Sequence, residues 1–175
     1  PKSVINEAKK LKGKKFDTKS VIDLRDKIFV TIDGKNAKDY DDAVLGEKDE
    51  KGNLILYVAI ADVGRYVEAA SNLDKEACDR STSVYFSQKV IPMLPEELSN
   101  DLCSLKPNED RFCLVCKTKV DEHGNLRDTS FFEAIINSKS RLTYATVTRE
   151  AEKNQFKKPY ANSLRTLLEI YKRLK

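Results

Sequence analysis

Four segments of the chain have the residue pattern of β-strands. Each is rich in β-branched and aromatic residues and is bounded by turn residues such as Gly, Asn and Asp. The turn sequences DEKGN and DEHGN favour chain reversals beside two of them. The pattern therefore predicts mainly antiparallel strands. The segments are KIFVTI (27–32), GNLILYVAIADVGRYV (52–67), FCLVCKTKV (112–120) and DTSFFEAIINSKSRLTY (128–144).

Two helices are predicted from their start signals. Ser71 or Asn72 is suited to cap a helix over 72–82, and Thr143 is suited to cap one over 144–154. Together with the strands, these helices predict an α+β fold. We expect the strands to form part of a mixed sheet or barrel, with the helices packed outside it.

A third helix is predicted over 161–175 because its apolar residues follow a helical period. They form one stripe, which needs a partner surface. We expect this stripe to pack on sequence beyond the chain or on a second copy. Its members are Leu164, Leu167, Leu168, Tyr171 and Leu174.

The segment 87–111 is long for a connection and holds three of the five prolines. Long connections without regular structure are usually functional or disordered. This one contains many apolar residues, which argue against disorder. We therefore expect it to wrap the core near a functional site. The apolar residues are Val90, Ile91, Met93, Leu94, Leu98, Leu102 and Leu105.

Composition favours a single domain, since 175 residues with 40% hydrophobic content suffice for one core of ordinary size. Residues 1–20 are basic, with weak helical spacing broken at Gly13, and are expected to form a linker or packed flank. The domain itself is assigned to 21–175. No apolar run approaches the roughly 20 residues that cross a bilayer, and the N-terminus lacks a secretory signal. We expect a cytoplasmic protein.

The four cysteines are expected to be reduced thiols, because their spacing does not resemble that of small secreted domains. Cys113 and Cys116 form a C-x-x-C sequence, but residues three apart on a strand face opposite sides of a sheet. The single histidine, His123, lies in a predicted turn. A zinc site is therefore disfavoured, and we interpret the two cysteines as small core residues.

Four aspartates, Asp33, Asp39, Asp41 and Asp42, lie within ten positions directly after the first predicted strand. Carboxylates brought together in a partly dry site repel one another strongly, so a cation is expected among them. Mg²⁺ and Mn²⁺ prefer carboxylate oxygens, and Mg²⁺ often completes its coordination with phosphate. The net charge of +4 also permits a polyanionic partner. The cluster predicts a metal site for phosphodiester chemistry.

Two other kinds of site fit this cluster less well. A calcium-binding EF-hand loop starting at Asp33 would need Gly and Glu where the chain has Lys38 and Val44. A phosphatase with Asp33 as nucleophile would favour an acid at Lys35. A solvated acidic turn between two strands stays open as an alternative.

Several segments together resemble the first half of the catalytic domain of the ribonuclease II/ribonuclease R family, and the ribonuclease R branch is the more similar. The resemblance runs from about Val21 to Val147. It implies Mg²⁺-dependent hydrolysis of single-stranded RNA from the 3′ end, releasing nucleoside 5′-monophosphates. The matching segments are VIDLRDKIFVTIDGKNAKDYDDAV, LYVAIADVGRYV, LDKEACDRSTSVYFSQKVIPMLPEELSNDLCSLKPNEDR and INSKSRLTYATV.

The resemblance assigns roles to individual acidic residues. Asp33 and Asp42 match metal ligands, and Asp39 matches a residue that supports the metal site. Asp41 matches the acid most closely linked to hydrolysis. These four positions are the implied catalytic centre.

The resemblance also implies RNA-binding residues. Tyr85 matches an aromatic that stacks on a base near the 3′ end, and Tyr144 matches a second substrate-side tyrosine. Stacking tolerates any base, as an unselective exonuclease requires. For Tyr144, packing at the start of a helix is the alternative that the residues alone favour. Arg80, Lys89 and Arg111 are candidate phosphate contacts, although lone basic residues are usually solvated surface.

Two departures from the family pattern affect these expectations. Gly64 and Arg65 stand where family members often have Ser-His. The second half of the catalytic domain and the flanking cold-shock and S1 RNA-binding domains are not in this sequence. We therefore expect a fragment that is not a competent nuclease by itself. A non-catalytic RNA-binding or scaffold relative is the alternative function.

Overall fold

The chain is described by a computed structural model that covers residues 1–14 and 16–175. Its centre is an open seven-stranded sheet in the order β1-β8-β7-β4-β3-β2-β9. The β1/β8 and β2/β9 pairs are parallel and the other pairs are antiparallel, which confirms the predicted mixed sheet of an α+β fold. The strands are β1 (Ile22–Asp23), β2 (Val30–Asp33), β3 (Asp42–Lys48), β4 (Leu54–Ala61), β7 (Asp110–Val120), β8 (Leu126–Asn137) and β9 (Ser140–Thr143).

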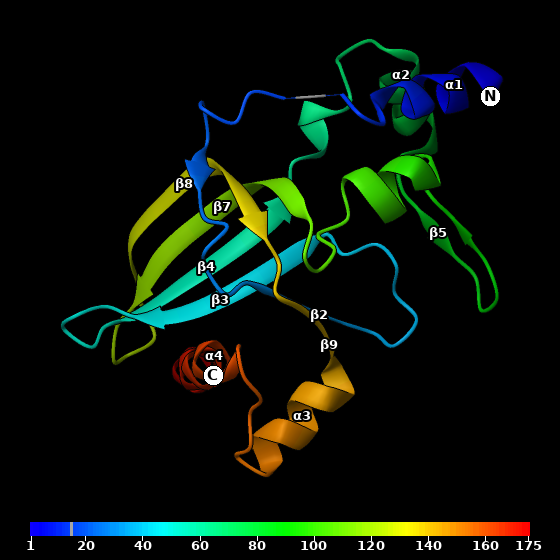
Figure 1. Cartoon of the computed structure of the whole chain (residues 1–175). Coiled ribbons are helices and arrows are strands. Elements are labelled where there is room, and N and C mark those ends of the chain that lie inside the picture. Colours follow the sequence, from blue (N-terminus) through cyan, green and yellow to red (C-terminus); the bar gives the residue numbers. More distant parts are fainter. Residues whose placement is uncertain (15) are drawn as a thin grey trace.

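Helices and a small hairpin surround this sheet (Figure 1). The two predicted caps are confirmed, because the side chains of Ser71 and Thr143 each accept a backbone N–H at 3.1 Å. The helices are α1 (Lys2–Leu11), α2 (Asn72–Arg80), α3 (Tyr144–Glu152) and α4 (Ala161–Leu174), with a 3₁₀ turn (Val63–Arg65) and a π-helical turn (Leu98–Leu102). The hairpin pairs β5 (Val84–Tyr85) with β6 (Val90–Ile91).

The segment 128–144, predicted as one strand, is two strands in different parts of the sheet. β8 pairs with β7, whereas β9 lies at the far edge and runs parallel to β2 with Asp33 opposite Thr143. The chain crosses near Lys139, whose N–H donates to the Phe29 carbonyl at 2.8 Å. Alternating residues favour a strand in either place, so the local pattern carries no sign of this crossing.

The alternation along β4 explains why both faces of the sheet are covered. Ile55 and Tyr57 belong to the main core, which also contains Val4 of α1 and Leu73 of α2. Leu54 points the other way and packs with Ile170 of α4. In Figure 1, α4 is seen end-on below β3 and β4, whereas α1 and α2 lie at the top. α1 therefore packs against the main core through Val4 and Ala8.

α4 approaches the sheet closely because β3 has a glycine at the contact. A Cβ on Gly46 would lie 2.8 Å from the Leu167 nitrogen, and the Gly46 N–H donates to Ser163 Oγ at 3.1 Å. The predicted stripe is only partly buried by this packing: Leu164 is buried, but Tyr171 and Leu174 stay exposed. The face of α4 that packs on the sheet therefore differs from the predicted apolar stripe. Its buried residues are Ala161, Ser163, Leu164, Thr166 and Ile170.

The predicted packing of the long segment 87–111 on the core is found from Met93 onward, whereas Val90 and Ile91 are exposed. Leu94, Leu98 and Leu105 are buried in the main hydrophobic cluster. The β5–β6 hairpin, whose second strand belongs to this segment, projects away from the sheet beside the β2–β3 connection (Figure 1). Among the described residues, no helix has the length and apolar character needed to cross a lipid bilayer.

Candidate active site

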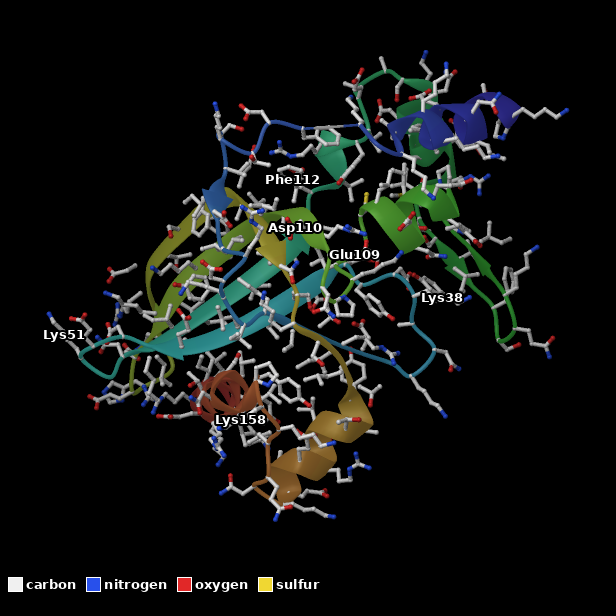
Figure 2. All side chains as sticks on the ribbon, viewed as in Figure 1. Lys38, Lys51, Glu109, Asp110, Phe112 and Lys158 are labelled. Carbon is white, nitrogen blue, oxygen red and sulfur yellow. The ribbon has the colours of Figure 1, made fainter. Side chains whose placement is uncertain are left out.

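The four aspartates lie where β2 and β3 meet their connecting loop. Asp33 is the last residue of β2 and Asp42 is the first of β3. Asp39 and Asp41 lie in the loop itself, and the carbonyl of Asp41 accepts the Ala61 N–H at 2.9 Å. Figure 2 shows Lys38, which belongs to this loop, at the opposite end of the sheet from Lys51. The local strand-turn-strand pattern thus gathers the acidic residues at one end of the sheet.

Side chains from distant segments hold this loop. Arg141 of β9 donates to the carbonyls of Gly34 and Lys35, at 2.8 and 2.6 Å. At the other end of the loop, Ser104 Oγ accepts the Tyr40 N–H at 3.0 Å and donates to the Lys38 carbonyl at 3.1 Å. The backbone between the two strands is therefore fixed at both ends.

The acidic side chains perturb one another electrostatically. Burial raises the pKa of Asp33, the negative charge of Asp42 raises it further, and Arg141 opposes the increase. Asp41 is partly open to solvent, but the protein around it excludes enough water to raise its pKa. The charges of Asp39 and Asp42 add to this effect. The cluster therefore favours a bound cation or proton.

The donor set fits a hard divalent cation. Among the described residues, none of the four carboxylates forms an ion pair with Lys, Arg or His. Carboxylate oxygens are the ligands that Mg²⁺ and Mn²⁺ prefer. Within residues 1–14 and 16–175, however, no three His, Cys, Asp or Glu side chains are gathered closely enough to hold a metal ion. The chemistry of these side chains, rather than their spacing in this structure, is therefore what fits a divalent cation.

Two tyrosines flank the acidic cluster. The Tyr85 hydroxyl donates to Asp39 Oδ2 at 3.1 Å, and the charge of Asp39 raises the pKa of Tyr85. Tyr85 is 66% exposed, so its ring is accessible to a ligand. Tyr144 is 63% exposed and follows Thr143, the residue paired with Asp33. The fold thus brings both tyrosines to the end of the sheet that carries the acids.

The three basic candidates are placed differently. Arg80 donates to Glu76 Oε1 at 2.8 Å and to the Pro92 carbonyl at 3.1 Å. Arg111 Nε donates to the Ser104 carbonyl at 2.9 Å, and its guanidinium also contacts other groups of the same segment. Lys89 is exposed in the β5–β6 hairpin. Both arginines are therefore hydrogen-bonded within the protein, whereas the Lys89 side chain forms no hydrogen bond or ion pair among the described residues.

Sequence reasoning did not single out Ser104 or Arg141, because no local signal marks them. Both reach the acidic loop from more than 60 residues away, Ser104 at Tyr40 and Arg141 at Gly34. The departure at Arg65 has a structural explanation. Its guanidinium pairs with Asp62 and Glu133 and lies 4.4 Å from the centre of the Phe112 ring.

Comparison with known proteins identifies the family. Residues 21–175 match the RNB domain. The chain is 48% identical over 158 residues to the "Ribonuclease R" of Vibrio parahaemolyticus, covering 88% of this chain and 19% of the relative. It therefore spans about a fifth of that relative's length.

Solved structures give the same result. The structure of Mycoplasma genitalium RNase R in complex with double-stranded RNA matches with a TM-score of 0.88 and 34% identity, covering 99% of this chain and 32% of the other. The complex of that enzyme with ribose methylated single-stranded RNA matches with a TM-score of 0.82 and 35% identity, covering 99% and 27%. On these matches and on the shared mixed sheet, this chain belongs to the RNB domain family.

Proposed function

We propose that the protein containing this chain is a Mg²⁺-dependent hydrolase that shortens single-stranded RNA from its 3′ end and releases nucleoside 5′-monophosphates. The observation that carries the proposal is the cluster of four aspartates, in which burial and the neighbouring carboxylates raise the pKa values of Asp33 and Asp41, with Tyr85 hydrogen-bonded to Asp39. Membership of the RNB domain family and the ribonuclease R relatives support it. Mn²⁺ is a second candidate cation.

The four carboxylates have different proposed roles. Asp33 and Asp42, at the two strand ends, are the proposed metal ligands, and Asp39 supports them while it accepts the Tyr85 hydroxyl. Asp41 acts in the hydrolytic step itself. When bound, a divalent cation supplies an acidified water and neutralises charge on the phosphoryl oxygens.

The exposed tyrosines supply an RNA-binding surface. Tyr85 offers its ring to a base while its hydroxyl stays on Asp39, and Tyr144 lies on the other side of the Asp33 strand end. Aromatic stacking holds any base, which suits stepwise degradation without sequence preference. Lys89 is the proposed phosphate contact on the same hairpin, with cold-shock and S1 domains expected elsewhere in the full-length protein.

Hydrolysis of a 5′-labelled single-stranded RNA by the full-length protein tests this function. We expect a ladder that shortens stepwise from the 3′ end and unlabelled nucleoside 5′-monophosphates as products. The 175-residue chain alone is expected to leave the RNA intact, because it spans 19% of its Vibrio relative. Early release of the labelled 5′ nucleotide, or RNA binding without any cleavage, would contradict the proposal. The second result would favour the non-catalytic alternative.

Replacement of Tyr85 by Ala is expected to weaken the binding of single-stranded RNA by about 5- to 150-fold, since base stacking on an aromatic contributes about 1–3 kcal/mol. Tyr85→Phe keeps the ring and is expected to retain most of the affinity. The dissociation constant is measured with EDTA present, so that no RNA is consumed. Tyr171→Ala, which removes an exposed tyrosine from α4, is the control. Equal affinities for Tyr85→Ala and Tyr171→Ala would remove Tyr85 from the binding surface.

A further inference from the structure

Ser104 is a completely buried polar residue, with a relative exposure of 0%, directly behind the acidic loop. Its hydroxyl accepts the Tyr40 N–H at 3.0 Å and donates to the Lys38 carbonyl at 3.1 Å. These two groups belong to the residues on either side of Asp39. The Ser104 hydroxyl therefore forms hydrogen bonds with both peptide groups that flank Asp39. It is the acceptor in one bond and the donor in the other.

The next residue of the same segment continues this attachment. The Leu105 N–H donates at 2.8 Å to the Tyr40 carbonyl, which belongs to the peptide that leads into Asp41. Asp41 also lies close enough to affect this segment electrostatically. Burial raises the pKa of the Cys103 thiol to about 12, and the negative charge of Asp41 contributes to this increase. The segment 103–105 thus lies against the backbone of both loop aspartates.

Hydrogen bonds from Arg111 hold the segment 101–105 in place. Arg111 Nε donates to the Ser104 carbonyl at 2.9 Å, and Arg111 Nη2 donates to the Asp101 carbonyl at 3.1 Å. Leu105 is buried in the main core, with a relative exposure of 0%. The Ser104 hydroxyl is therefore held by a rigid support, whereas the loop that it contacts carries like charges that repel one another.

We propose that Ser104 is a positioning residue, which sets Asp39 and Asp41 for divalent cation binding by fixing the backbone on both sides of Asp39. The inference rests on the proposed function of the aspartate cluster. Ser104 touches neither RNA nor the reacting atoms and acts through the loop. Groups that orient metal-binding residues commonly change metal affinity or activity by about 10- to 100-fold when they are removed.

The test compares Ser104→Ala with Ser138→Ala in the full-length protein. Ser138 is an internal control, because it is also buried, with a relative exposure of 1%, and its hydroxyl has no hydrogen-bond partner among the described residues. Each substitution removes the same buried oxygen, but only the first removes hydrogen bonds to the loop. Mn²⁺ binding is measured directly without RNA, and amide hydrogen exchange is measured at Tyr40.

Ser104→Ala is expected to weaken Mn²⁺ binding by about 10- to 100-fold and to accelerate exchange of the Tyr40 amide. The half-saturating Mg²⁺ concentration for RNA hydrolysis is expected to rise in parallel. Ser138→Ala is expected to match the unmodified protein in all three measurements. Thermal unfolding of both variants reports whether the fold is intact.

The outcomes separate this inference from the proposed function. Equal Mn²⁺ affinity and equal Tyr40 exchange in the two serine variants would overturn the positioning role, even if Asp41→Asn is inactive. A Ser104→Ala protein that does not fold, when Ser138→Ala folds, would also overturn it in favour of a general structural role. Full activity of Asp41→Asn would instead reject the proposed function of the cluster.

Discussion

The Asp41→Asn protein is expected to hydrolyse RNA about 10²- to 10⁴-fold more slowly than the unmodified protein, which is the usual range for loss of a group acting in the chemical step. Its affinity for single-stranded RNA is expected to be retained. The physical reason is that Asn keeps the size and polarity of the side chain but removes the charge. Burial raises the pKa of Asp41, and the charges of Asp39 and Asp42 raise it further. The negative charge of Asp41 is the property that a cation would need.

The measurement is single-turnover hydrolysis of a 5′-labelled RNA, with RNA binding measured separately in EDTA. Asp79→Asn is the matched control, because Asp79 is exposed on α2 and forms no side-chain hydrogen bond or ion pair among the described residues. The control makes the same change in charge away from the loop. An unchanged rate for Asp41→Asn would assign the four aspartates to a solvated acidic turn.

Withdrawal of divalent cations is expected to abolish hydrolysis and to lower the stability of the protein. A cation that binds only the folded state at about 100 times its dissociation constant raises the free energy of unfolding by about 2.7 kcal/mol. Addition of Mg²⁺ to EDTA-treated protein is therefore expected to raise its melting temperature. The same addition to Asp41→Asn is expected to give a smaller increase. Equal increases in the two proteins would place the bound cation away from this cluster.

The effect of Mg²⁺ is expected to weaken as the pH falls. In the folded protein, the pKa values of Asp33 and Asp41 are raised above the ordinary value of 3.8. Without metal, these two groups bind protons at a higher pH than in the unfolded chain. They favour the folded state at low pH, and this contribution is lost as the pH rises through the raised pKa values. Protons compete with the cation for the same oxygens, so the half-saturating Mg²⁺ concentration should increase as the pH approaches this range from neutrality.

The position of the acidic cluster was predictable because its determinants are local. A short apolar strand precedes Asp33, and Ala43 and Val44 return the chain to the sheet after Asp42. Strand, turn and strand need only residues that are close in sequence. The helix starts at Ser71 and Thr143 were predictable for the same reason, since a cap is a contact between neighbours.

The surroundings of the cluster depend on contacts between distant segments. Tyr85 meets Asp39 across 46 positions, and Ser104 meets Tyr40 across 64. The resemblance to a family pointed to Tyr85, but nothing in the residues around Ser104 marks its contact. Arg111 was a candidate for phosphate binding, and its local sequence carries no sign that carbonyls of the segment 101–104 occupy its donors.

The sequence by itself determined most of the strand and helix types, the acidic cluster between β2 and β3, and the membership of the RNB domain family, because these follow from local patterns and from the order of motifs. Only the tertiary structure decided that β9 crosses the sheet to lie beside β2, which face α4 buries, and how Ser104 holds the acidic loop. The reason is that the helical or strand periodicity of a segment fixes which side of that element each side chain occupies. The residues that a side chain contacts on other elements depend on how all the elements pack into one core.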